Sequence, residues 1–337
     1  MGDIMTLSEL FISLGYTEEE YLYIRGHYTF RRTSDDRLMI NVSRNYNWFC
    51  EIYDKHNVIK MTNNYPFLYA LTIENLEQKI NDLILLGYTR EEVIEFTKKY
   101  PLLYALNINK IKEKIEYMKT LGYTYNQVLK LYKLTPTIFG LDSEIIDIKK
   151  KNMLSLGYTE EEFVKMTKNY PMIYSYGIEN IKQKASDLLS LGYSKENFLK
   201  LTNSQPALFS YSIDSIKQKI SDLMSFGYTR DEVLKMTVGC PQLYGYSYEN
   251  IKNKVDFYDS IGLHELANIH PSYLMQSVDL SYVRYHFYKE NGIDITMDNY
   301  AKLFCSEKNF QKLYNITKRE LLEKYNYSKE KVYVRKK

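Results

Sequence analysis

A cation recurs every 35 residues in this sequence, always thirteen residues after a proline. The regular members of this column are Lys79, Lys114, Lys149, Lys184, Lys219 and Lys254, and the less regular flanks add Arg44, Arg284 and Arg319. Lysine and arginine side chains bind phosphate oxygens, and such contacts position a protein on a nucleic acid. A regular line of them could follow a phosphate backbone, which advances by about 3.4 Å per nucleotide of each strand. The nine cations are therefore the candidate phosphate-binding residues.

Two other residue types keep the same 35-residue period, and together they define a tandem repeat. The glycines are Gly87, Gly122, Gly157, Gly192, Gly227 and Gly262. The prolines are Pro66, Pro101, Pro136, Pro171, Pro206 and Pro241. Since two different residue types share one period, each unit is one structural element that has been copied.

The unit at residues 87–121, GYTREEVIEFTKKYPLLYALNINKIKEKIEYMKTL, predicts two helices. Gly87 suits a helix C-terminus, and Thr89 with Glu92 forms a capping box that begins the first helix. Pro101 ends that helix, and Asn107 caps the second one. Such a pair cannot bury its own apolar stripe, so neighbouring units have to stack. We predict an all-α protein, a right-handed α-solenoid or superhelix of about nine repeats.

We expect one solenoid over residues 1–337, with atypical repeats at both ends. Pro271 follows Gly262 by nine residues instead of fourteen, which indicates a five-residue deletion in that repeat. Ser306 takes the proline position in the last repeat. The predicted parts are a degenerate repeat at 15–51, six regular repeats at 52–261, a shortened repeat at 262–291, a degenerate repeat at 292–325 and a basic tail at 326–337.

The helical period places Lys184 at the border of the apolar stripe that contains Ile181 and Leu188. Its stem can pack there while its ammonium group extends outward. Second helices commonly line the concave side of a solenoid, so the column predicts a basic concave groove. In the alternative interpretation each lysine pairs with an acid of the next repeat, for example in the column Glu179, Asp214 and Glu249.

Other recurring side chains favour structural roles. Lysines on the first helix fall opposite its apolar face, which is typical of a solvated surface; they are Lys60, Lys130, Lys165, Lys200 and Lys235. The aromatic residue three positions after each proline and the tyrosine after each glycine predict packing, although the former could also stack on bases.

Catalysis finds no support, because nucleotide-binding, metalloprotease and nucleophile-elbow motifs are absent from the sequence. We expect no enzyme activity, no cofactor, no metal and no small-molecule substrate. Three dispersed cysteines and an acidic start without a signal or transit peptide favour a reducing cytoplasmic location. No apolar stretch is long enough to span a membrane, and we expect a monomer.

The pattern LGY-T/S-x-x-E-V, followed by P-x-L-Y and I-E-N-I-K-x-K, resembles the mitochondrial transcription termination factor (mTERF) family. The resemblance is strong over residues 52–261 and weaker in the flanks. It implies a superhelix with two α-helices and a short 3-10 turn per unit. It also implies double-stranded nucleic-acid binding along a basic inner groove, with DNA preferred to RNA, and a role in transcription regulation or termination.

Two other functions stay open from the residues alone. Basic and acidic side chains number 45 and 42, which leaves a net charge of only +3 and favours a protein-binding scaffold for a peptide or helix. RNA binding through the aromatic columns is a third function.

Overall fold

The computed structural model describes residues 5–325, and every regular element in that range is a helix. The tail predicted at residues 326–337 lies outside the described residues. The helices gather into two compact units, residues 5–155 with 159–175 and residues 156–158 with 176–325. Each unit is a stack of helical repeats, which confirms the predicted all-α helical-repeat fold. That the whole chain forms one solenoid stays a prediction.

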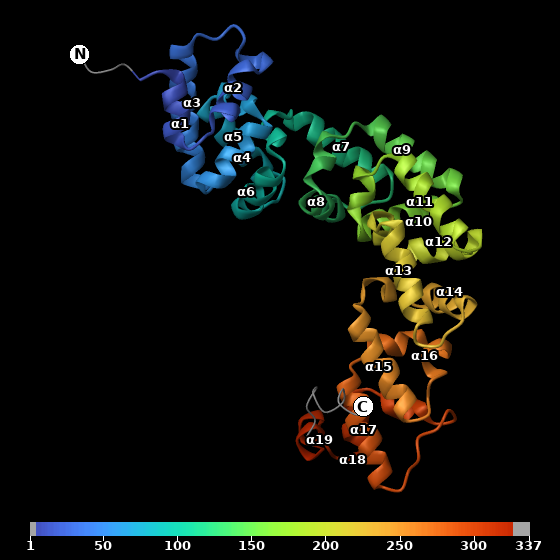
Figure 1. Cartoon of the computed structure of the whole chain (residues 1–337). Coiled ribbons are helices and arrows are strands. Elements are labelled where there is room, and N and C mark those ends of the chain that lie inside the picture. Colours follow the sequence, from blue (N-terminus) through green and yellow to red (C-terminus); the bar gives the residue numbers. More distant parts are fainter. Residues whose placement is uncertain (1–4, 326–337) are drawn as a thin grey trace. The chain divides into compact units, whose positions relative to one another are not determined.

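In the first unit a first α-helix, a 3-10 helix and a second α-helix follow one another in each repeat (Figure 1). The first helices are α2 (Glu18–Gly26), α4 (Lys55–Asn64), α6 (Arg90–Lys99), α8 (Tyr125–Leu134) and α10 (Glu160–Asn169). The 3-10 helices are η1 (Tyr28–Phe30), η2 (Pro66–Ala70), η3 (Pro101–Ala105), η4 (Pro136–Gly140) and η5 (Pro171–Ser175). The second helices are α3 (Asp35–Ile52), α5 (Ile73–Leu85), α7 (Ile108–Thr120) and α9 (Ser143–Leu156), and α1 (Leu7–Leu14) precedes them all.

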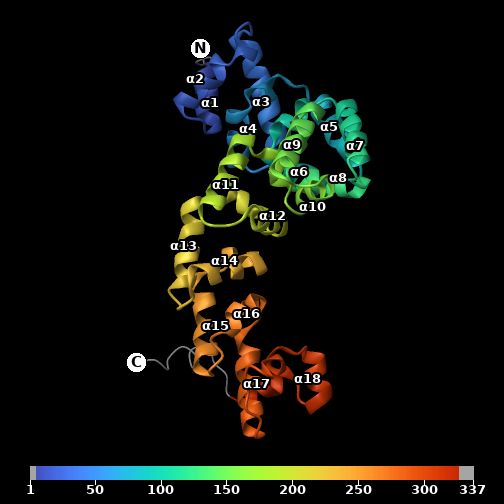
Figure 2. The same cartoon turned by 90° about the vertical axis from the view of Figure 1, so that its right-hand side faces the viewer.

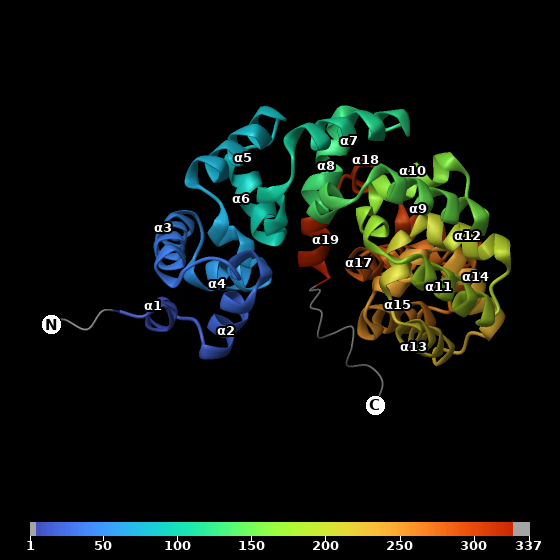
Figure 3. The same cartoon turned by 90° about the horizontal axis from the view of Figure 1, so that it is seen from above.

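The two kinds of helix form two rows in the first unit. In the view of Figure 3, α3, α5 and α7 follow the outer side of the curve from α3 to α8, and α4, α6 and α8 follow its inner side. This differs from the expectation that second helices line the concave side. The first helices, not the second ones, line the inner side of this stretch.

The second unit continues the same order. Its second helices are α11 (Ile178–Ser190), α13 (Ile213–Met224), α15 (Tyr248–Ser260) and α17 (Val278–Glu290). Its first helices are α12 (Lys195–Ser204), α14 (Arg230–Gly239) and α16 (Leu266–Ile269), and its 3-10 helices are η6 (Pro206–Ser210), η7 (Pro241–Gly245), η8 (Pro271–Met275) and η9 (Tyr300–Phe304). The unit ends with α18 (Glu307–Tyr314) and α19 (Lys318–Lys324). Figure 2 shows the second helices along one side of this unit and the first helices along the other.

The predicted caps fix where the first helices begin. Thr89 Oγ1 accepts from the backbone N–H of Glu92 at 3.2 Å, and the Glu92 carboxylate accepts from that of Thr89 at 3.1 Å. The same reciprocal box begins α8, α10 and α14. Each box satisfies backbone donors that have no partner within the helix.

The repeated glycine makes the turn from one repeat to the next. Gly157 has φ +115°, a left-handed conformation that L side chains rarely adopt. A Cβ atom there would lie 3.2 Å from Leu199 Cδ1 of the next first helix. The glycine therefore permits both the turn and the close approach of the following repeat.

A hydrogen-bonded set of hydroxyl groups, which we call the tyrosine ladder, crosses the repeat interfaces. The Tyr193 hydroxyl lies 2.6 Å from Thr237 Oγ1 and 2.5 Å from the Tyr244 hydroxyl of the next repeat. Thr237 Oγ1 in turn donates to the Val233 carbonyl at 2.9 Å. Equivalent sets are Tyr16 with Thr62 and Tyr69, Tyr53 with Thr97 and Tyr104, and Tyr123 with Thr167 and Tyr174. The packing predicted for these tyrosines thus includes buried hydrogen bonds.

The ladder is interrupted at the interface that Tyr88 faces. Tyr132 takes the threonine position, Phe139 takes the tyrosine position, and Tyr88 donates to the Leu129 carbonyl at 3.1 Å instead. The Tyr132 side chain is fully buried, and among the described residues its hydroxyl has no hydrogen-bond partner. An unpaired buried hydroxyl destabilises a fold, so the Tyr132 hydroxyl weakens this interface.

The end repeats depart from the regular pattern. Helix α16 has four residues where α14 has ten, as the predicted five-residue deletion requires. The prediction for Ser306 was wrong: this residue is not at the proline position but caps α18, where its Oγ accepts from the backbone N–H of Asn309 at 3.2 Å. Helix η9 takes the place of the proline-led turn, so the last repeat is displaced by six residues. A serine followed by an acid favours a helix N-cap, which explains the difference.

None of the helices between residues 5 and 325 is long and apolar enough to cross a bilayer.

Candidate nucleic-acid interface

The predicted cation column lies on the second helices, and most of it is buried. The exposed fraction of these side chains is 2–8% at six positions, namely Lys79, Lys114, Lys184, Lys219, Lys254 and Arg284. On α5, α7, α11, α13 and α15 the lysine occupies the apolar stripe that packs against the next repeat, and Arg284 is buried on α17. At these six positions the cation lies inside a repeat interface.

The buried ammonium groups donate to main-chain carbonyl groups of the following repeat. Lys114 Nζ lies 2.7 Å from the Phe139 carbonyl oxygen, and Lys219 Nζ lies 2.5 Å from that of Tyr246. Lys79, Lys184 and Lys254 donate in the same way to Leu106, Tyr211 and Leu274. These acceptors lie in or directly after the 3-10 helices, whose last carbonyl groups have no partner within the helix. The column therefore satisfies buried acceptors between repeats.

Arg284 does the same for the irregular last repeat. Its Nη1 lies 2.8 Å from the Leu303 carbonyl oxygen and 2.7 Å from that of Cys305. Its guanidinium group also lies over the Phe310 ring, 4.8 Å from the centroid. Arginine thus reaches two acceptors where the turn has changed.

Pairing with acids of the next repeat, the alternative interpretation of the column, does not hold for these six residues. Their partners are carbonyl groups, and the acid nearest to one of them is Asp222, 3.8 Å from Lys219 on the same helix. Glu179 of the expected acidic column instead pairs with Lys182 of its own helix at 3.2 Å.

Burial shifts the pKa values of the column lysines and of the ladder tyrosines. Desolvation lowers the pKa of the column lysines, including the half-buried Lys149. Desolvation also raises the pKa of the ladder tyrosines above 10.0, and that of Tyr16 to about 12. The two pKa shifts change the free energy of unfolding in opposite directions as the pH rises.

We expect the fold to lose stability as the pH rises above about 10. The folded chain keeps phenol protons that the unfolded chain releases there, so it binds more protons and its stability falls with pH. The lysines act in the opposite direction, because their folded form loses protons first, but the tyrosines with raised pKa are more numerous. Urea midpoints measured from about pH 8 to 11 would test this. A midpoint that stays constant or rises would contradict it, and the tyrosinate absorbance of the buried ladder tyrosines should appear together with unfolding.

Arg44 is exposed, and its neighbour Asn45 holds the buried position of the column. Asn45 Nδ2 donates to the carbonyl groups of Leu68 at 2.8 Å and Leu71 at 2.9 Å, and Arg44 Nη2 donates to Leu71 at 3.0 Å. Arg44 therefore reaches the same acceptor position as Lys79, 27 residues further along the chain, but Asn45 holds the buried position. Asn45 was not predicted as a column residue because it carries no charge. Its spacing from the buried Val42 and Phe49 nevertheless places it in the apolar stripe of α3.

Arg319 lies outside the column. Its side chain on α19 is 87% exposed and pairs with Glu323 at 2.8 Å. Because η9 begins at Tyr300, the column position of this repeat is Leu313. The displaced turn in the last repeat explains the error.

The lysines of the first helices are exposed, as the sequence predicts. Lys200 pairs with Glu196 at 2.7 Å. Among the described residues no ion pair is found for the other four, which are Lys60, Lys130, Lys165 and Lys235. Cations that an external anion can reach therefore lie on the first helices rather than in the column.

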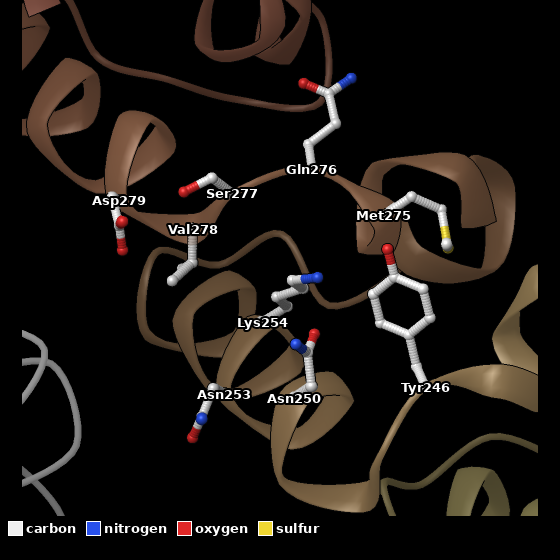
Figure 4. A pocket seen from close by; sticks show the side chains of 9 residues that line it. All are labelled: Tyr246, Asn250, Asn253, Lys254, Met275, Gln276, Ser277, Val278 and Asp279. Atoms are coloured by element: carbon white, nitrogen blue, oxygen red, sulfur yellow. The ribbon is translucent and has the colours of Figure 1, made fainter. Parts of the chain in front are cut away.

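Beside Lys254 the surface has a hollow of about 320 Å³, where α15, η8 and the start of α17 meet. Figure 4 shows the Lys254 ammonium, the Tyr246 hydroxyl and the Asn250 amide turned toward it. Lys254 Nζ also lies 4.9 Å from the Tyr246 ring centroid. This ammonium group reaches the edge of the hollow while it donates to the Leu274 carbonyl group.

Within residues 5–325 no three His, Cys, Asp or Glu side chains form a group that could hold a metal ion.

Comparison with known proteins identifies the repeat. The mTERF family model matches the chain twice, over residues 37–191 and over residues 179–311. A comparison with curated proteins found no match. The two matches cover well over half of the 337 residues, and they include the regular repeats and part of the irregular repeat at each end. The chain belongs to the mTERF family.

Proposed function

We propose that this chain binds nucleic acid, with duplex DNA as its ligand, and acts in the regulation or termination of transcription. The observation that carries this proposal is the double match to mTERF, a family known for nucleic-acid binding and transcription termination. The stacked repeats support it, because a stack presents the same surface position again and again along its length.

Phosphate contact by the nine-cation column stays a prediction. Six of its members are buried and bonded to carbonyl groups, so contact with a phosphate would carry the cost of desolvating that anion. Exposed cations carry no such cost. We therefore propose that accessible cations make the phosphate contacts and that the buried column holds the repeats that carry them.

We expect the affinity for a labelled DNA duplex to fall steeply with salt, with a log–log slope of about −0.9 per phosphate contact. Replacing the buried Lys184 by methionine should leave this slope unchanged. A loss of about 0.9 from the slope in that variant would instead support contact by the column. Fluorescence anisotropy over a salt series measures both, with circular dichroism to confirm that the variant is folded.

Duplex RNA and single strands of the same sequence complete the experiment. Stronger binding to RNA would contradict the choice of DNA. Absence of binding to every nucleic acid, or a flat salt response, would contradict the function itself and favour a protein-binding scaffold.

A further inference from the structure

We infer that a hollow between the C-terminal ends of α4 and α6 binds the phosphates of a nucleic-acid strand through Lys60, Lys98 and Lys99. This inference rests on the proposed function and assigns it a place in the fold.

The hollow has a volume of about 590 Å³, within the range of about 300–1,000 Å³ that is usual for ligand sites. Its lining residues are Asn57, Lys60, Met61, Asn64, Tyr65, Lys98, Lys99 and Pro101. Helices α4 and α6 both lie on the inner side of the first unit in the view of Figure 3. A strand that follows this inner side would pass both helices that carry the hollow.

The lining contains three lysines and no acid. Lys60 and Lys99 are exposed, and among the described residues no ion pair is found for either. Lys98 Nζ lies 2.6 Å from Glu95 Oε1, a carboxylate outside the lining. Lys98 is thus partly neutralised, whereas Lys60 and Lys99 repel one another, and an anion placed between the lysines lowers that repulsion. A phosphodiester group has the matching charge and several acceptor oxygens, and the exposed Asn64 amide adds a donor at the rim.

The repeat alone does not produce this concentration of charge. At the next junction the positions of Asn57 and Lys60 hold Glu92 and Glu95, and Leu134 takes the position of Lys99. Lys133, which corresponds to Lys98, is paired with Glu92. The junction of α4 with α6 is thus chemically different although the backbone repeats.

Helix electrostatics explain only part of the arrangement. Lys98 and Lys99 lie in the last turn of α6, where cations stabilise the negative end of the helix dipole. That effect does not require Lys60, which comes from the neighbouring helix and faces the same hollow. The convergence of cations from two repeats is what indicates a ligand.

The test compares two triple variants. Lys60→Gln, Lys98→Gln and Lys99→Gln together remove three charges from the hollow. The matched control, Lys130→Gln, Lys200→Gln and Lys235→Gln, removes three lysines from the same position of other first helices. For a labelled DNA duplex the hollow variant should bind on the order of ten- to a hundredfold more weakly, with a salt slope smaller by about 2–3. The control should lose clearly less of both.

Equal losses in the two variants, or no loss in the hollow variant, would overturn the site while wild-type binding would still uphold the proposed function. No binding by the wild-type chain would remove both. Titration with inorganic phosphate separates the source of the anion. Phosphate binding that the hollow variant loses, together with unchanged duplex binding, would make this a small-anion site and overturn its assignment to a strand.

A gain-of-binding variant keeps the inference testable without any loss of folding. Glu95→Lys removes the carboxylate that pairs with Lys98 and places a lysine where five other repeats have one. Affinity for the duplex should rise severalfold, and the salt slope should become steeper. Unchanged or weaker binding by this variant would contradict the proposed role of the hollow.

Discussion

Replacing the buried Lys114 by methionine should lower the free energy of unfolding by about 1.5–3 kcal/mol, the usual range for a hydrogen bond to a charged group. Methionine keeps most of the apolar stem but cannot donate to the Phe139 carbonyl oxygen, which Lys114 Nζ contacts at 2.7 Å. The carbonyl group would then be buried without this donor. The loss should occur although the substitution makes the interface more hydrophobic.

Lys112→Met provides the matched control, because Lys112 lies two residues earlier on α7 and is exposed. Its substitution should change stability by no more than about 0.5 kcal/mol. Urea unfolding gives both values, and hydrogen exchange should show the loss for Lys114→Met first at the backbone near η4. Equal midpoints for the two variants would show that the buried ammonium contributes no net stability.

Tyr193→Phe should destabilise the chain by about 1–3 kcal/mol, because the substitution leaves a buried hydroxyl without its partner. The lost hydroxyl lies between Thr237 and Tyr244. Thr237 keeps its bond to the Val233 carbonyl, whereas the buried Tyr244 hydroxyl loses the contact with Tyr193 and keeps only its interaction with Thr237. The cost therefore falls mainly on Tyr244.

The same substitution at Tyr132 should have the opposite sign. Tyr132→Phe removes a buried hydroxyl that has no hydrogen-bond partner among the described residues, so we expect unchanged or higher stability, by up to about 1 kcal/mol. Thermal unfolding of the two variants side by side measures the difference. Equal losses at Tyr193 and Tyr132 would mean that ring packing, and not hydrogen bonding, decides the contribution of these tyrosines.

The sequence was sufficient for the repeat fold, because the fold depends on local signals. Thr89 with Glu92, Pro101 and Gly157 mark a helix start, a helix end and a left-handed turn, and each does so through its own backbone chemistry. The last repeat lacks its proline, and there the alignment failed. Without that marker, Ser306 could be placed at the turn or at the cap of the following helix.

The position of the column was harder to predict than its existence. Helical periodicity places Lys184 at the edge of an apolar stripe, but that edge can face solvent or the next repeat. Which of the two it faces depends on how the repeats pack, which periodicity within one helix does not specify. The hydrogen-bond acceptor of the lysine could not be predicted from the sequence either, because every residue type has a main-chain carbonyl group. In the tyrosine ladder the partners are side chains, and the joint recurrence of Tyr193, Thr237 and Tyr244 with the period could have indicated it.

The bond from a lysine to a main-chain carbonyl makes the repeats interchangeable. Its acceptor residue is Leu106, Phe139, Tyr211 or Leu274 at different interfaces, and the lysine tolerates each of them. As far as this bond is concerned, a unit can follow another without a compensating substitution in its neighbour, whereas the tyrosine ladder requires matching side chains. Copies can be gained, lost or shortened while their outer surfaces diverge, so this chain could acquire one strongly cationic junction among otherwise similar ones.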